Sequence, residues 1–247
     1  MVYRWINLVQ NRLLPAVCLL CGAPGEAPGR DLCAGCRRDL PLNAHACPRC
    51  AEPLPASAPA GTVCGRCRRL PPPFAAAFAP YRYDWPLDRL IVELKFRRRL
   101  AVARVLGTLF AEALAVRLAA GAPRPQALVP VPLHPKRLAA RGYNQAAELA
   151  RPVARMLGLP LLDAGRRVRD TAAQSALAFR ERRRNVAGAF VLAQRVPHAH
   201  IALIDDVLTT GHTAGECARA LQAGGVERVE VWTLARTPAP GKPGRTA

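Results

Sequence analysis

Apolar residues beyond residue 74 recur at two spacings, and these predict an alternation of helices and strands. Helical spacing runs through residues 85–96, 102–118, 143–157 and 213–223, with Pro152 expected to bend or break the third helix. Short apolar runs at 127–131, 190–192, 201–204 and 229–234 predict buried strands, and residues 74–83 are expected to be extended. Strands that alternate with helices imply an α/β fold with a mostly parallel sheet and flanking helices.

The sequence Leu-Pro-Pro-Pro at 70–73 is stiff and predicts a domain boundary. It separates an N-terminal unit, 1–70, from an α/β domain, 74–237, and a tail, 238–247, that is expected to be disordered. Residues 1–14 fit a short amphipathic helix packed on its own domain or, in the alternative, lying on a membrane surface. The sequence has no secretory signal and no apolar window of ~18 residues, so it predicts a cytoplasmic protein without a membrane span.

Eight of the nine cysteines form four Cys-x-x-Cys pairs before this boundary: Cys18/Cys21, Cys33/Cys36, Cys47/Cys50 and Cys64/Cys67. Two residues between thiolates form a tight turn that points both sulfurs at one ion, and two such turns complete a tetrahedral zinc site. Disulfides would need an oxidising compartment, and redox chemistry would need only one such pair. The pattern therefore predicts a small double zinc ribbon with two structural zinc ions. Sequential pairing of the four turns is the simplest arrangement, and a crossed pairing stays open.

The formal net charge of +19 favours a polyanionic partner. Nearly all of this charge is arginine, which also fits a compositional bias of the source genome. Within the N-terminal unit, Arg66, Arg68 and Arg69 sit in or beside the last cysteine pair. We predict that these three bind nucleic-acid phosphates. The equal alternative is that they form a solvated rim on a purely structural unit.

Two adjacent carboxylates, Asp205 and Asp206, follow the apolar run 201–204. A hydroxyl-rich turn at 209–213 then leads into a helix, whose start is supported by the capping-box spacing of Thr213 and Glu216. Backbone N–H groups and the helix dipole at such a turn favour a phosphate, and paired carboxylates suit two vicinal hydroxyls or Mg²⁺. Together these features predict a ribose 5-phosphate site. A plain acidic turn that closes a strand is the alternative.

Two further stretches are rich in basic residues. Residues 129–137 and 141–145 follow a predicted strand, which suggests a second anion pocket at the carboxyl edge of the sheet; a charged surface loop is the alternative. Residues 166–185 mix arginine with small polar residues, as in a mobile loop that closes over a polyanion or in a solvated charged loop.

These motifs occur in a characteristic order. Cysteine pairs come first, then Pro-x-Pro-Leu-x-x-x-Arg with Arg-Gly-x-Asn-Gln, Asn-Val-x-Gly-x-Phe, and Asp-Asp-Val-x-Thr-Thr-Gly. From about residue 13 to residue 236 the sequence resembles the ComF competence-protein family. The resemblance implies a double zinc ribbon joined to a type I phosphoribosyltransferase-like domain, and a link to DNA uptake and natural transformation.

The same resemblance implies roles for individual residues. The acidic pair matches the ribose contacts, 209–213 the 5-phosphate loop, 133–137 the pyrophosphate loop and 166–184 a flexible loop. The parent motif often has a small residue at position 212, so His212 is expected to act through its backbone. The predicted PRPP-binding residues are Asp205, Asp206, Thr209, Thr210, Gly211, His212, Thr213, Leu133 and His134. The predicted catalytic residues are Asp205, Asp206, Lys136, Arg137 and Arg180.

Two functions follow from this sequence. The first is a phosphoribosyltransferase-type protein that takes PRPP or a nucleotide together with Mg²⁺, in which the acceptor base is not indicated. The second is a non-catalytic single-stranded DNA binding protein that uses the ribbon and the basic loop, with other DNA-uptake proteins as further partners. The low aromatic content, 5%, counts against broad binding by base stacking.

Overall fold

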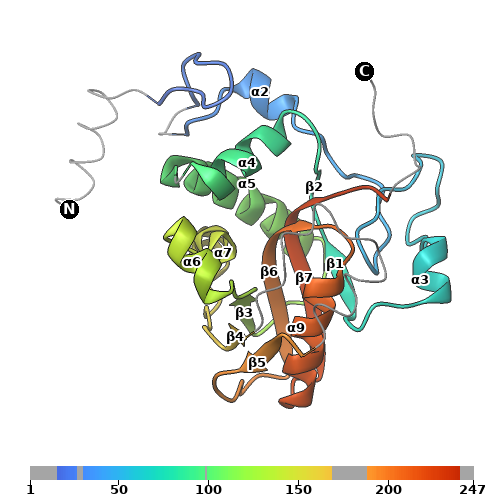
Figure 1. The fold of residues 1–247 in the computed structure, drawn as a ribbon. Coiled ribbons are helices and arrows are strands. Elements are labelled where there is room, and N and C mark those ends of the chain that lie inside the picture. Colours follow the sequence, from blue (N-terminus) through green and yellow to red (C-terminus); the bar gives the residue numbers. More distant parts are fainter. Residues whose placement is uncertain (1–15, 27–29, 98, 169–187, 240–247) are drawn as a thin grey trace.

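A parallel sheet forms the centre of the fold (Figure 1). The computed structural model describes residues 16–26, 30–97, 99–168 and 188–239. The strands lie in the order β1 (Ala76–Phe78), β7 (Arg228–Arg236), β6 (His200–Leu208) and β3 (Ala127–Pro130), and β2 (Tyr81–Arg82) continues along the same edge of β7 as β1. Every pair in this sheet is parallel, which confirms the predicted fold class.

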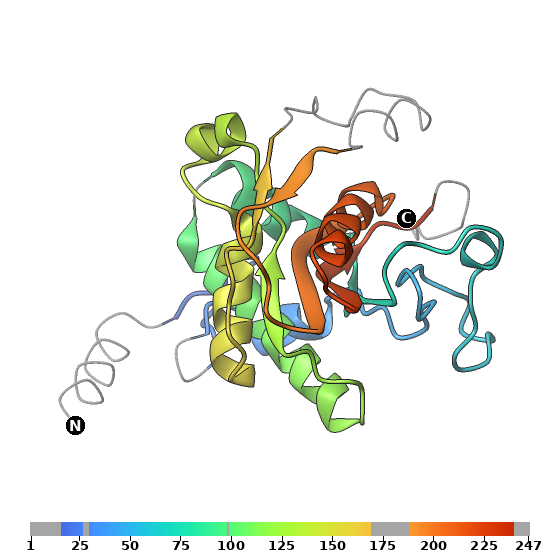
Figure 2. The ribbon, with the colours of Figure 1, turned by 90° about the horizontal axis from the view of Figure 1, so that it is seen from below.

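Helices cover both faces of the sheet, as Figures 1 and 2 show. On one face α4 (Leu87–Phe96), α5 (Leu100–Ala119) and α7 (Gln145–Leu157) pack over alternate strand residues such as Ile204 and Trp232. On the other face α9 (His212–Ala223) packs over Leu203 and Val231. Because strand side chains alternate between faces, each central strand contributes to both cores.

Helix α7 is continuous across Pro152, so the predicted break is absent. A Cβ placed on Gly107 of α5 would lie 2.7 Å from Cγ of Pro152, closer than packed carbon atoms can approach. The missing side chain at Gly107 therefore makes room for the proline ring where the two helices meet.

Two elements differ from the sequence-based expectation. The predicted strand at 190–192 exists as β5 (Phe190–Leu192), but it pairs antiparallel with β4 (Gly165–Arg167) outside the main sheet. The proline-rich turn after β3 contains a short helix, α6 (Pro135–Arg141), which the apolar pattern did not indicate. Arg137 and Arg141 of α6 reach a cavity at the end of β6, and Gly165 of β4 lies against Pro132, just after β3.

The cysteine-rich unit contains two short helices, α2 (Ala34–Arg38) and α3 (Gly65–Arg69), and packs against the α/β domain in two places. Leu32 and Leu40 of the first half are buried in the core formed by α4 and α5. The second half lies along β1 and β2, where the Ala77 N–H donates to the carbonyl of Pro48. The predicted helix at 1–14, Arg180 and the final residues 240–247 lie outside the described residues.

Among the described residues, no helix combines the length and the apolar character needed to cross a bilayer.

Candidate functional site

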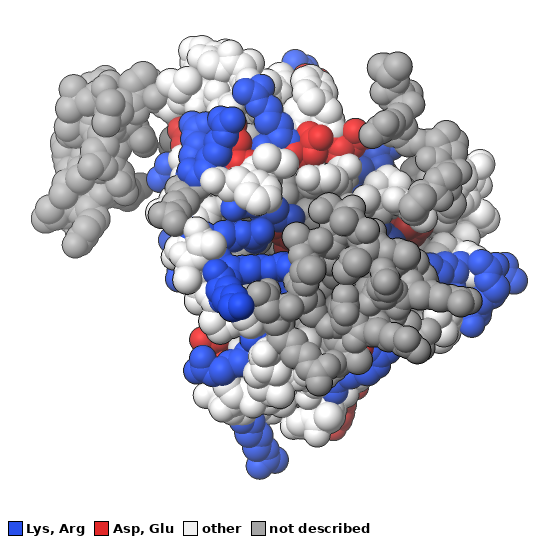
Figure 3. Space-filling model, in the orientation of Figure 1, with Lys and Arg blue, Asp and Glu red and all other residues white. Residues whose placement is uncertain are grey.

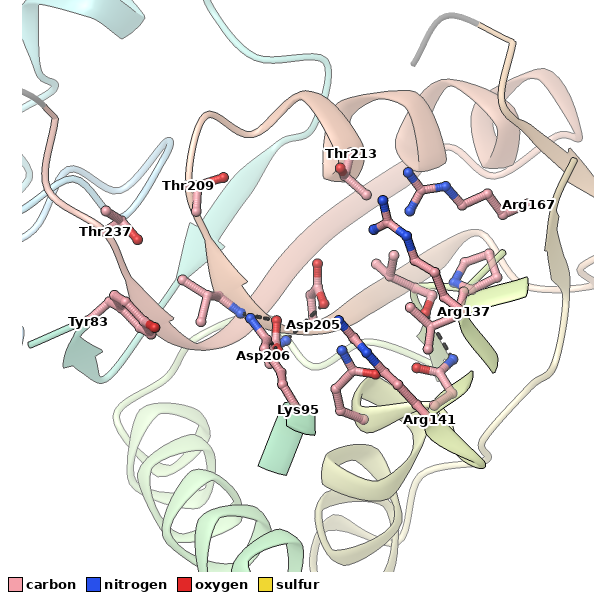
Figure 4. Close-up of a pocket in the computed structure, with 16 residues that line it drawn as sticks. Tyr83, Lys95, Arg137, Arg141, Arg167, Asp205, Asp206, Thr209, Thr213 and Thr237 are labelled. Carbon is pink, nitrogen blue, oxygen red and sulfur yellow. Dashed lines mark hydrogen bonds and ion pairs between the residues drawn. The ribbon is translucent and has the colours of Figure 1, made fainter. Parts of the chain in front are cut away.

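The acidic pair lies inside β6, whereas the sequence placed it after the end of a strand. The apolar run stops at Ile204 and β3 ends beside it, but β7 continues to pair with β6, aligning Asp205 with Thr233 and Leu208 with Arg236. Side chains of neighbouring strand residues point to opposite faces. Asp206 consequently faces α4, and Asp205 points toward Thr213 at the start of α9 (Figure 4).

The two carboxylates have different partners. Nζ of Lys95, on α4, lies 2.9 Å from Oδ2 of Asp206, and Oδ1 of Asp206 accepts a hydrogen bond of 2.7 Å from the Val207 N–H. Burial alone would lower the pKa of Lys95, but the Asp206 carboxylate outweighs it and the pKa is raised. Burial, with the negative charge of Asp206 in addition, raises the pKa of Asp205 to about 7. Lys95 and Asp206 thus form an ion pair, and Asp205 holds its proton more tightly than an ordinary carboxyl group does.

The turn after β6 presents backbone N–H groups at a helix N-terminus. Gly211 is the N-cap of α9, with φ of +80°, a conformation that favours glycine. The predicted capping box is wrong: the N-cap is a glycine, Thr213 is already helical, and a Glu216 carboxylate oxygen accepts from the Gly188 N–H at 3.2 Å. The Thr210 hydroxyl accepts a long hydrogen bond of 3.5 Å from the His212 N–H, at the first position of α9. The helix dipole favours an anion at this N-terminus.

A cavity of about 310 Å³ separates the acidic pair from a basic wall (Figure 4). Arg137 and Arg141 come from α6, whose N-terminus is capped by the imidazole of His134 and begins with Pro135. Arg167, from β4, is buried on the same side and stacks on Phe190, with its guanidinium carbon 5.5 Å from the ring centre. Figure 3 shows Lys and Arg side chains gathered over α4 and α6 on this face.

The structure brings most of the predicted site residues together. Asp205, Asp206, Thr209, Thr213, Leu133 and Arg137 line the cavity. Lys136 lies on α6 and His134 is its N-cap, but neither lines the cavity. Thr210, Gly211 and His212 lie between the two lining threonines, 209 and 213. Arg180 lies outside the described residues. Five further lining residues belong to the stretches 129–137 and 141–145, for which the sequence suggested an anion pocket: Val131, Pro132, Arg141, Asn144 and Gln145. Arg167 belongs to the basic stretch 166–185. The lining residues that no sequence-based prediction singled out are Tyr83, Lys95, Val207 and Thr237.

The eight paired cysteines form two tetrads. Cys18, Cys21, Cys33 and Cys36 make the first, and Cys47, Cys50, Cys64 and Cys67 the second, so the pairing is sequential. The Sγ atoms of Cys21 and Cys33 lie 3.7 Å apart, as do those of Cys50 and Cys64. A zinc ion bonded to four sulfurs at 2.3 Å would require sulfur separations of about 3.8 Å, so both tetrads have the geometry of zinc-ribbon sites. The second tetrad is fully buried, whereas Cys21 of the first is exposed.

The three predicted nucleic-acid contacts lie on α3, between and after the last two cysteines. Arg66, Arg68 and Arg69 are all exposed, but a guanidinium N–H of Arg66 donates to the carbonyl of Thr210 at 2.8 Å. This residue therefore contacts the turn between β6 and α9.

Comparisons with known proteins agree with this architecture. The family model described as "Double zinc ribbon domain" matches residues 9–68. The DNA utilization protein YhgH of Salmonella typhi is 38% identical over 226 residues, covering 91% of this chain and 98% of that protein. Competence protein F of Haemophilus influenzae is 35% identical, covering 89% and 96%.

Solved structures that match part of the chain include phosphoribosyltransferases. The match to the hypoxanthine-guanine phosphoribosyltransferase of L. donovani covers 54% of this chain and 67% of that enzyme's chain, at 14% identity and a TM-score of 0.33. The match to the purine phosphoribosyltransferase of Pyrococcus horikoshii covers 62% of this chain and 83% of that enzyme's chain, at 14% identity and a TM-score of 0.30. With full-length relatives above 30% identity, a double zinc ribbon and a parallel α/β domain, the chain belongs to the ComF competence-protein family.

Proposed function

We propose that the cavity binds the ribose 5-phosphate group of PRPP or of a nucleotide, and that the protein is of the phosphoribosyltransferase type. The observation that carries this proposal is the composition of one cavity. Two carboxylates, two threonines at a helix N-terminus and four cationic side chains, Lys95, Arg137, Arg141 and Arg167, surround the same space. A ligand that carries both hydroxyls and phosphates complements this set.

Each wall of the cavity suits one part of such a ligand. The acidic pair accepts hydrogen bonds from the two ribose hydroxyls. The turn 209–213 takes the 5-phosphate on backbone N–H groups and threonine hydroxyls. The arginines of α6 and β4 neutralise a pyrophosphate at the opposite side, which would stabilise it as a leaving group.

Mg²⁺ fits this site only when it is shared with the ligand. Lys95 already holds one oxygen of Asp206, so the protein offers no closed cage of oxygen atoms. Mg²⁺ is usually bound by one or two carboxylates together with substrate phosphates and waters, which is what the cavity and a bound PRPP would provide. The ion would supply positive charge against the developing charge on the pyrophosphate.

Titration calorimetry with PRPP and Mg²⁺ tests the proposal, with Asp205→Asn plus Asp206→Asn as the variant. We expect the wild type to bind and the double variant not to bind. Exposed Asp163→Asn is the matched control and should bind as the wild type does. Asp206 is buried and paired, so an unfolding curve must accompany each variant. A folded double variant with unchanged affinity contradicts the site, and pyrophosphate release with a panel of nucleobases tests for turnover.

A second candidate function, binding of single-stranded DNA during DNA uptake, is favoured by an exposed stripe on α4. Arg89, Val92 and Phe96 follow one another at helical spacing on α4, and Trp85 lies just before the helix. All four side chains are exposed, Trp85 by 69% and Phe96 by 70%. The guanidinium carbon of Arg141, which also lines the cavity, lies 5.6 Å from the Phe96 ring centre. Aromatic faces between arginines are what unpaired bases and their phosphates require.

Binding of fluorescent oligonucleotides at several salt concentrations tests this second function. Trp85→Ala plus Phe96→Ala should weaken binding by at least about tenfold, because stacking contributes about 1–3 kcal/mol per base. Val116→Ala, a change of an exposed apolar residue on α5, should leave binding unchanged. Replacing Arg68 and Arg69 instead should flatten the salt dependence if the ribbon binds phosphates. If the wild type does not bind the oligonucleotides at low salt, this second function is contradicted and only the phosphoribosyltransferase proposal stands.

A further inference from the structure

We infer that Arg66 is a positioning residue for the phosphate-binding turn, so that the second zinc ribbon forms part of the ligand site. This inference rests on the proposed ribose 5-phosphate site and names a residue that sets its geometry. Arg66 lies on α3 between Cys64 and Cys67, both of which are buried members of the second tetrad. A zinc ion bound to these two cysteines would fix the backbone on both sides of Arg66.

The contact is made to the backbone of the turn. Nη2 of Arg66 donates to the carbonyl of Thr210 at 2.8 Å and lies 3.8 Å from the position that a Cβ on Gly211 would occupy. Carbonyl and N–H of one trans peptide point in opposite directions. An arginine that holds the Thr210 carbonyl on its own side therefore turns the Gly211 N–H away from α3, and this N–H belongs to the set available to an anion.

The other side of the turn is also held from the second ribbon. Arg236, which is buried, donates from Nη1 to the carbonyl of Leu208 and from Nε to the carbonyl of Cys50, both at 3.0 Å. Its Nη2 lies 2.6 Å from a carboxylate oxygen of Glu52. The carbonyls at 208 and 210, which flank Thr209, are thus both fixed by guanidinium groups tied to the ribbon.

Arg68 provides a matched control for Arg66. It lies two residues away on the same short helix, is exposed, and carries the same charge. We expect Arg66→Ala to weaken binding of ribose 5-phosphate by about tenfold, the cost of one hydrogen bond from a charged donor, and Arg68→Ala to weaken it by less than about twofold. Zinc content should be unchanged in both variants, because neither residue is a cysteine ligand.

Hydrogen exchange without ligand separates this inference from the proposed function. The amides of residues 209–213 should exchange faster in Arg66→Ala than in Arg68→Ala or the wild type. If exchange is faster in Arg66→Ala but the wild type does not bind ribose 5-phosphate, the proposed function is overturned. The structural role of Arg66 is then still supported. Equal exchange in the two variants, or equal losses of affinity, would overturn the inference, because the effect would then be one of net charge alone.

Discussion

Asp205 and Asp206 are neighbours in sequence, but their carboxyl groups lie in different electrostatic environments. Asp206 has its own counterion in Lys95, while Asp205 is half-buried beside the negative charge of Asp206, and both effects raise its pKa. The lysine is separated from the pair by most of the α/β domain in sequence. No local pattern could have identified it, because only the packing of α4 against the sheet brings its ammonium group to the site.

We predict that the affinity for ribose 5-phosphate rises with pH through about 7, because ionised Asp205 accepts hydroxyl hydrogen bonds more strongly than the neutral acid. The folded pKa lies above the ordinary value, so the carboxyl is protonated below pH 7 and charged above it. Calorimetry at pH 6 and pH 8 should show a gain of up to about tenfold. The phosphate itself titrates near pH 6, so Asp205→Asn supplies the baseline. A variant with the same pH profile as the wild type would contradict the assignment.

At the scale of elements, the structure shows why some were predictable and others were not. Strands β6 and β7 bury continuous runs of side chains, helix α7 buries apolar side chains at helical spacing, and both patterns are visible in the sequence. Helix α6 buries no side chain, so it left no apolar pattern. Its bounds were nevertheless marked by Pro135 at the first turn and Gly142, in the left-handed conformation, after the last. Strand β6 extends beyond its apolar run, because its backbone pairing with β7 does not depend on the polarity of the side chains.

The two cysteine tetrads should bind one zinc ion each and release them at different rates. Cys21 is exposed, whereas all four cysteines of the second tetrad are buried, so a chelator should remove the first zinc faster. Elemental analysis should give two zinc ions per chain. A colorimetric chelator assay should show two phases, and Cys21→Ser should abolish the faster one. One zinc ion in the wild type, or a fast phase that survives in Cys21→Ser, would contradict this prediction.

At the scale of the whole molecule, the ribbons and the α/β domain share buried polar contacts as well as apolar ones. The first ribbon joins the core of α4 and α5, and the second meets the carboxyl edge of the sheet through Glu52 and Arg236. This second contact was not visible in the sequence, because Glu52 and Arg236 belong to different units and carry no motif. The family resemblance predicted both units, but it said nothing about the side chains that join them.

Arg236→Met should destabilise the folded protein by about 3–5 kcal/mol, because it leaves the Glu52 carboxylate buried without its guanidinium partner. Denaturant unfolding measures this loss. The variant Arg236→Met plus Glu52→Leu removes both charges and should recover part of it. An exposed arginine of α7, Arg151→Met, serves as the control and should change stability by less than about 1 kcal/mol. A double variant no more stable than the single one would contradict this reason and assign the loss to the hydrogen bonds of Arg236 with the carbonyls of Cys50 and Leu208.

The Glu52–Arg236 pair also has a consequence for how the chain is made. Glu52 leaves the ribosome before Arg236, which lies 184 residues later at the end of β7. Domains tend to fold in the order of synthesis, but a contact between such distant positions cannot form until both are available. The second ribbon can bring its cysteines together during translation, but Glu52 has no guanidinium partner until β7, which contains Arg236, has been synthesised. The carbonyl of Leu208, which Arg236 also holds, is therefore fixed on this side only after β7 has been synthesised.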